Sequence, residues 1–122
     1  MKIKFRKTGF TLLETMMTVG IIGLLAAIAI PGFKRVRASY QANHCVYNLT
    51  QIVAAANQFS MDHAMPAGTN LSYPNDLTPY IKLNSAGSIP GCPANGTYTL
   101  SFVGAMPLCS LGNNVNPPHV LP

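Results

Sequence analysis

One acid, Glu14, lies inside the most apolar stretch of the sequence, in the string K-T-G-F-T-L-L-E at residues 7–14. It is the only charged residue between positions 10 and 30. Insertion scales make a charged side chain at the centre of a membrane helix unfavourable by roughly 2.5 to 3.5 kcal/mol. An acid in such a run therefore needs a partner of opposite charge or a function that requires it.

The apolar stretch is long enough to cross a membrane. It runs from residue 10 to residue 30, and a helix of that length spans about 31 Å, close to the ~30 Å hydrocarbon core of a bilayer. Basic clusters precede and follow it, at Lys2, Lys4, Arg6 and Lys7 and at Lys34, Arg35 and Arg37. Because the leading cluster is the larger, we expect a cytoplasmic amino terminus and a carboxy terminus outside.

The charges and motifs argue against nucleic-acid binding and against catalysis. Eight bases oppose three acids, giving a net charge of +5, but only Lys82 lies beyond residue 37. The distal part therefore has no basic stripe to contact phosphates. No G-x-S-x-G, P-loop or H-E-x-x-H string occurs, and no acid or histidine stands in a recognisable nucleophile arrangement. We expect neither an enzyme nor a cofactor.

The remainder predicts an α+β chain in four parts. Residues 1–9 form a basic leader, 10–31 the transmembrane helix, 32–62 an amphipathic helix, and 63–122 a small globular head. Apolar residues recur at helical spacing in the third part, at Ala42, Cys45, Val46, Leu49, Ile52, Val53, Ala56 and Phe59. Within the head, residues 97–103 alternate as a half-buried strand, and a turn at 104–105 leads to a second short strand near Leu108. Pro31 and Gly32 predict a kink rather than an end of the helix.

The string K-T-G-F-T-L-L-E, followed by an apolar span that contains Gly23 and Pro31, resembles the amino terminus of type IV pilin-like proteins. This family includes pilins and type II secretion pseudopilins, and the resemblance covers residues 4–37. It implies that a prepilin peptidase cuts between Gly9 and Phe10 and methylates the new amino group of Phe10. Glu14 then stands where the family has its acidic residue. In a low dielectric, its carboxylate would pair with the cationic amine of a neighbouring subunit's Phe10 and set the axial register.

The resemblance also implies a function, partners and a location. We expect a structural subunit of a pilus-like filament, most similar to a type II secretion pseudopilin that supports protein export. The alternative is a type IV pilin or minor pilin whose head binds a surface or DNA. Expected partners are the peptidase and methyltransferase, further copies in a helical polymer, minor pilin-like subunits and an inner-membrane assembly platform. The precursor would cross the bacterial inner membrane once and then enter a periplasmic or cell-surface filament, with Gly23 and Pro31 giving the helix flexibility.

Simpler interpretations of the same residues stay open. Thr11 and Glu14 have the spacing of a capping box, in which both side chains bind free amides at a helix start. The basic leader is also compatible with the positive flank of an uncleaved membrane anchor.

The carboxy-terminal strings C-P-A-N-G-T-Y-T-L and P-L-C-S resemble a subset of pseudopilin-type proteins that end in a small cysteine-flanked β segment. A disulfide between Cys92 and Cys109 would close a loop and stabilise the head by about 3 kcal/mol. A bond from Cys45 to either cysteine, or a free buried Cys45, stays open. The histidines, at 44, 63 and 119, lack metal-ligand spacing, and the only acids beyond the span are Asp62 and Asp76. We therefore expect no zinc or copper site, and the calcium site of major pseudopilins is in doubt.

Overall fold

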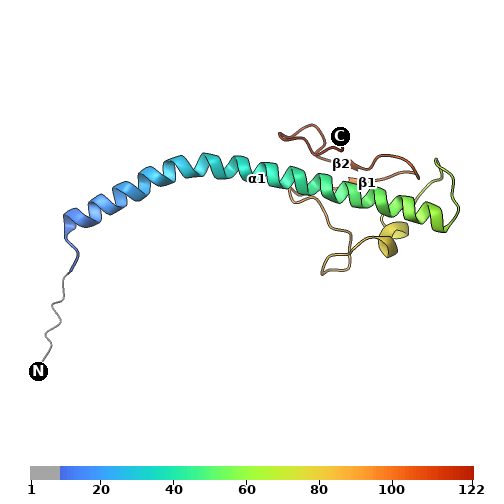
Figure 1. Ribbon diagram of the computed structural model, residues 1–122, viewed down its shortest axis with the longest axis horizontal. Coiled ribbons are helices and arrows are strands. Elements are labelled where there is room, and N and C mark those ends of the chain that lie inside the picture. Colours follow the sequence, from blue (N-terminus) through green and yellow to red (C-terminus); the bar gives the residue numbers. More distant parts are fainter. Residues whose placement is uncertain (1–8) are drawn as a thin grey trace, which may run out of the picture. The chain divides into compact units, whose positions relative to one another are not determined.

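The structure is a computed structural model that describes residues 9–122. Its elements are the long helix α1 (Leu12–Asp62), the 3₁₀ helix η1 (Asn75–Tyr80), and the strands β1 (Tyr98–Thr99) and β2 (Leu108–Cys109) (Figure 1). A long amino-terminal helix followed by a small region with short antiparallel strands confirms the predicted fold class. The contacts divide the chain at residues 36 and 37 into two units. The predicted leader, residues 1–9, lies outside the described residues except for Gly9.

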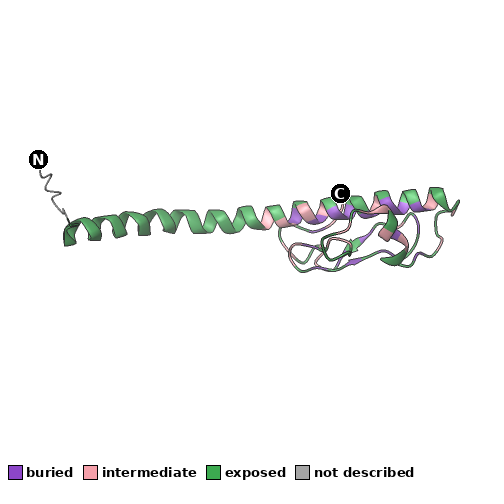
Figure 2. Ribbon diagram, turned by 90° about the horizontal axis from the view of Figure 1, so that it is seen from below, coloured by how far each residue is buried: buried purple, intermediate pink, exposed green. Residues whose placement is uncertain are grey.

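The first unit contains only the beginning of α1 and the residues before it. The helix starts at Leu12 because the Thr11 hydroxyl accepts a hydrogen bond from the Glu14 backbone N–H at 3.2 Å. Pro31 lies inside α1, as the sequence predicts for a proline in a continuous apolar run. Every described residue from 9 to 37 is exposed (Figure 2). The apolar side chains of this unit therefore have no core of their own.

The second unit is built on one face of the later part of α1. Figure 2 shows buried residues following one side of the helix there, against the segments that come after it. Leu49, Ile52 and Cys45 have no exposed surface. The buried helix residues are Ala42, Cys45, Asn48, Leu49, Ile52, Ala55, Ala56 and Phe59. The predicted apolar stripe is thus the face that holds the core, with Val46 and Val53 half-buried at its edges.

The head that covers this stripe consists mostly of turns and loops. β1 and β2 form an antiparallel pair in which Tyr98 faces Cys109 and Thr99 faces Leu108. The predicted strand over residues 97–103 is too long, because the backbone leaves the β2 partner after Thr99. Val103 instead donates its N–H to the Thr69 carbonyl at 2.9 Å, and Leu71 donates to Ser101 at 3.2 Å. The loop after α1 therefore takes the hydrogen bonds that a longer hairpin would have used.

Leu49 provides a test of this core. Replacing Leu49 with Ala should lower the free energy of unfolding by about 2 to 5 kcal/mol, because the side chain is fully buried and leaves a cavity. Denaturant unfolding of the full chain in detergent, followed by tyrosine fluorescence, measures this because the chain has no Trp. Met61→Ala is the control, since Met61 is 79% exposed on the same helix. Equal losses in both variants would contradict the assigned core.

Candidate functional site

The residues of the predicted processing site lie in open backbone ahead of α1. Gly9 and Phe10 precede the helix and are exposed, Phe10 by 80%. A Cβ added at Gly9 would meet no atom within 4 Å, so the peptide bond after it is sterically open to an enzyme. Residues 1–8 lie outside the described residues, and the cut itself stays a prediction.

Glu14 occupies the third position of α1, where the capping interpretation places it. The Thr11 hydroxyl already accepts the Glu14 backbone N–H, which is one of the two bonds of a capping box. The Glu14 side chain is exposed, in the first turn of the helix, where the helix dipole favours an anion. Helix capping thus accounts for the role of the Thr11 hydroxyl, while the exposed Glu14 carboxylate stays accessible to a second chain.

The other polar side chains of the first two turns have partners within the helix. The Thr15 hydroxyl donates to the Leu12 carbonyl at 2.8 Å, and the Thr18 hydroxyl donates to the Thr15 carbonyl at 2.9 Å. These hydroxyls therefore need nothing from outside α1 when lipid or protein covers it. A negatively charged carboxylate differs from them, because a neutral local bond does not offset the loss of its hydration.

The surface around Glu14 is a continuous apolar helix. The most apolar window of α1 has a mean hydropathy of 2.1 and is entirely unburied, so by length and composition the helix is able to cross a membrane. Soluble monomers rarely expose so large an apolar surface. Gly23 and Pro31 both lie on it, and a Cβ at Gly23 would have no neighbour within 4 Å. The flexibility assigned to these two residues stays a prediction.

A second group of reactive side chains lies in the head. Cys45, Cys92, Cys109 and His119 place one donor atom each within 4.8 Å of one another. All four residues are buried, and the three cysteines are free thiols in the structure. Cys92 Sγ and His119 Nδ1 lie 3.3 Å apart. The predicted pairing of Cys92 with Cys109 stays a prediction, and Cys45 is near enough for its alternatives as well.

Sequence reasoning missed His119 as a member of this group. The four residues come from α1, from the loop before β1, from β2 and from the tail, and their spacing matches no metal-binding motif. For this group, the sequence indicates only that Cys45 lies on the buried stripe of the helix. The tail carries His119 inward, where its backbone N–H donates to the Gly112 carbonyl at 2.8 Å.

The surroundings of Cys45 and Cys92 shift the pKa values of their thiols in opposite directions. Burial raises the pKa of the Cys45 thiol to about 12. Burial acts on Cys92 in the same direction, but hydrogen bonds from the backbone of Ala94 and Gly96 and from the other two cysteines hold its pKa below the ordinary value. Beside the thiols, Asn48 donates its side-chain N–H to the Tyr98 hydroxyl at 3.2 Å and to the Gly91 carbonyl at 3.1 Å. These bonds tie α1 to the segment that carries Cys92.

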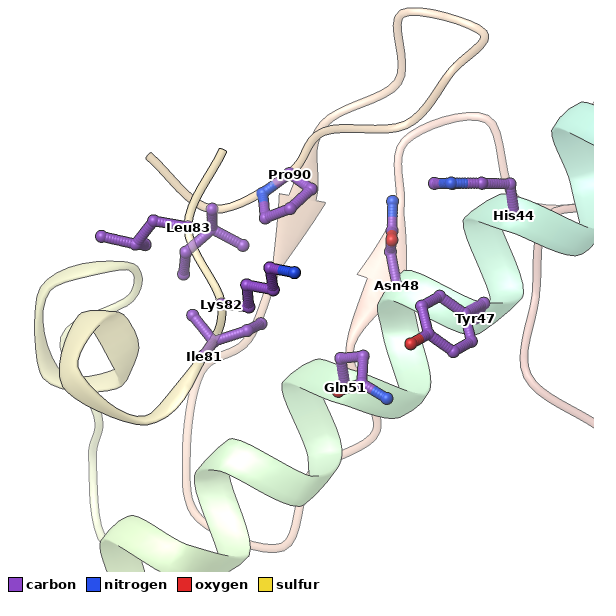
Figure 3. A pocket seen from close by; sticks show the side chains of 9 residues that line it. His44, Tyr47, Asn48, Gln51, Ile81, Lys82, Leu83 and Pro90 are labelled. Carbon is purple, nitrogen blue, oxygen red and sulfur yellow. The ribbon is translucent and has the colours of Figure 1, made fainter. Parts of the chain in front are cut away.

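An open groove of about 370 Å³ lies on another face of the head. In Figure 3, His44, Asn48 and Gln51 project from α1 on one side, and Lys82 comes from the opposing loop. The His44 Nδ1 atom is buried there without a hydrogen-bond partner among the described residues. The lining includes neither a carboxylate nor a serine or cysteine, so the groove has no acid or nucleophile of the usual catalytic kinds.

The amino-terminal end of the chain matches a known family. Residues 4–30 match the model of the prokaryotic N-terminal methylation motif. The amino-terminal part of the chain is similar to that of type IV pilins. This match covers Gly9, Phe10, Glu14 and Gly23 in one continuous segment.

Curated relatives agree with this assignment. The chain is 44% identical over 54 residues to the type IV major pilin protein PilA of Myxococcus xanthus, covering 44% of this chain and 24% of the relative. It is 46% identical over 48 residues to a fimbrial protein of Pseudomonas aeruginosa, covering 39% and 31%. It is 30% identical over 90 residues to the type IV major pilin protein PilE of Neisseria gonorrhoeae, covering 74% and 46%.

The matched region thus spans less than half the length of each of these relatives. No solved structure matches the chain significantly. The family result supports the prediction of a structural protein without enzymatic activity. It does not specifically support a secretion pseudopilin.

Gly96 tests the packing around the thiols. A Cβ at this position would lie 2.7 Å from Cys109 Sγ and 3.2 Å from Cys92 Cβ. Gly96→Ala should therefore lower the free energy of unfolding by about 1 to 3 kcal/mol through overpacking. Gly91→Ala is the matched control, because a Cβ at Gly91 meets no atom within 4 Å. Denaturant unfolding of the two variants side by side measures the difference, and an unchanged midpoint for Gly96→Ala would refute the close approach.

Proposed function

We propose that this protein is a structural subunit of a type IV pilus, with residues 10–30 as the membrane anchor of its precursor and the core of its filament. The observation that carries the proposal is the methylation motif over residues 4–30, joined to an apolar helix with no covering of its own. A membrane covers that helix in the precursor, and the helices of other copies cover it in the polymer. In both environments the same apolar side chains are removed from water.

The relatives favour a pilus over a secretion pseudopilus. In the sequence, a small head without an obvious long variable loop favours a pseudopilin. The relatives described above are named type IV major pilins and a fimbrial protein. In addition, the Asp76 carboxylate accepts the Ser72 N–H at 2.8 Å, which gives this acid a local role in the loop. A calcium site of the pseudopilin type thus gains no support from it.

Glu14 would set the position of each new subunit. Cleavage after Gly9 creates a cationic amine at Phe10, four residues before the acid. In a filament whose apolar helices stack, the amine of one copy lies at the depth of the carboxylate of another. The pair forms in a low dielectric, where an unpaired Glu14 is strongly unfavourable. Because the contact joins different surfaces of two copies, it is heterologous and propagates without closing.

The same proposal names the partners and the place of action. A prepilin peptidase and methyltransferase process the precursor, an inner-membrane platform assembles it, and minor pilin-like subunits join it. The precursor spans the bacterial inner membrane with its carboxy terminus outside, and the mature chain becomes part of a surface filament. A DNA-binding head has little support, since Lys82 is the only base beyond residue 37 and lies in a groove.

The amino terminus of the mature protein tests the processing. Intact-mass and peptide mass spectrometry of material from native filaments or membranes should find a chain that begins at Phe10 and carries one methyl group. Gly9→Val should leave the full precursor uncut, because a side chain then stands beside the scissile bond. Gly20→Ala, an equally open glycine within the span, should be cut normally. A mature chain that still begins at Met1 would overturn the proposal.

Glu14→Gln tests the pairing with a side chain of the same size. The variant should insert and be cut normally, whereas its incorporation into sheared filaments should fall at least roughly tenfold, as expected when a contact above about 1.4 kcal/mol is lost. Thr18→Ala is the control, since the Thr18 hydroxyl binds only within its own helix. Immunoblots of the membrane and filament fractions separate the two effects. Normal filament yield from Glu14→Gln would exclude the ion pair.

A further inference from the structure

The geometry points to a structural zinc site in the head, formed by Cys45, Cys92, Cys109 and His119. The methylation motif assigns nothing to these residues, since it ends at residue 30. The ligands are three thiolate sulfurs and the Nδ1 atom of the imidazole. Sites of three cysteines and one histidine are a common structural zinc set.

The distances fit a tetrahedral ion. The four donor atoms lie within 4.8 Å of one another. Zn–S bonds of about 2.3 Å in a tetrahedron put two sulfurs about 3.8 Å apart, and a Zn–N bond of about 2.0 Å gives a sulfur–nitrogen edge of about 3.5 Å. Cys92 Sγ and His119 Nδ1 are already 3.3 Å apart. Rotamer adjustments within the site are therefore enough to bring all four atoms to bonding distance.

The burial of the ligands indicates a closed site. Cys45 has no exposed surface, and Cys92, Cys109 and His119 are exposed by 7%, 6% and 4%. No water position is needed, because the protein supplies all four ligands. Closed four-ligand sites hold structure, whereas catalytic zinc keeps an open position.

The composition of the cluster favours an ion over a disulfide. A disulfide joins two of the three sulfurs and leaves a buried thiol and a buried imidazole beside it. One divalent ion uses all four donors and offsets two of the three thiolate charges.

The backbone around the cluster is shaped for close approach. Asn95 donates its N–H to the Cys92 carbonyl at 3.0 Å and has a φ of +63°, which closes a tight turn after Cys92. Gly96 then passes so near Cys109 Sγ that a Cβ would clash with it. This tight turn brings the backbone at Gly96 close to the Cys109 sulfur.

The site would fasten segments that little else holds together. The two strands have two residues each, and most of the head is loop. A small core of this kind usually needs a crosslink or a metal for stability. The ion would connect α1, the loop before β1, β2 and the tail at one point, so its binding energy would become folding energy of the head.

The first experiment uses the full mature chain, extracted from membranes into detergent with neither chelator nor thiol reagent, and only a separate portion is denatured and alkylated for the intact mass. Elemental analysis should find one zinc ion per chain. X-ray absorption should show a shell of three sulfurs and one nitrogen, and the intact mass should show no disulfide. A disulfide between any two of the three cysteines, or a zinc-free chain with three alkylated thiols, would overturn the site.

Variants distinguish the site from adventitious binding. His119→Gln and Cys45→Ser should lose the ion, whereas His63→Gln should keep it, because His63 is exposed and belongs to no such cluster. Chelation of the unmodified chain should lower the melting temperature of the head, and added zinc should restore it. Zinc retained equally by all three variants would mean surface binding only. Should the ligand variants fail to fold, the X-ray absorption spectrum of the unmodified chain decides alone. None of these readouts depends on filament formation.

Discussion

The apolar first part of α1 cannot remain in contact with water, and this constraint governs the rest of the molecule. All of its described residues up to Arg37 are exposed, although most are aliphatic. Such a surface is stable only in lipid or against other apolar helices. The Glu14 carboxylate on this surface restricts how such helices pack, because it favours only those arrangements that bring a cation to the same depth. In the proposed pilus subunit, anchoring and polymerisation are therefore two outcomes of the same physical demand.

The second part of α1 carries the hydrophobic core of the head on one of its faces. After Arg37 one face becomes buried, and the chain that returns over it is too short and too irregular to form a large sheet. Specific polar contacts replace sheet hydrogen bonding at several points. Asn48 binds both Gly91 and Tyr98, and Gln41 donates to the Pro93 carbonyl at 3.3 Å. These bonds hold the cysteine-bearing loop against the helix.

Features of the fold that depend on residues close together in the sequence are predictable, whereas those that depend on distant segments are not. The capping of the first turn by Thr11, the buried stripe through Leu49 and the position of Glu14 depend on neighbours within one or two turns, and local patterns encode them. The alternation over residues 97–103 predicts too long a strand, because alternation says nothing about which segment supplies the partner. Residues 101–103 bind the loop at 68–71 instead. The partner depends on the path of the loops between these segments, which no local sequence pattern indicates.

The sequence by itself determined the processing motif, the apolar span with its single acid, and the amphipathic helix that follows, because composition and periodicity are enough to define them. Only the tertiary structure decided which donors share a site in the head. Cys45 and His119 are separated by most of the second unit along the chain, yet their donor atoms lie within 4.8 Å. Spacing in the sequence carries no trace of this, because the path of the loops between them, rather than a helical or strand repeat, brings the four residues together.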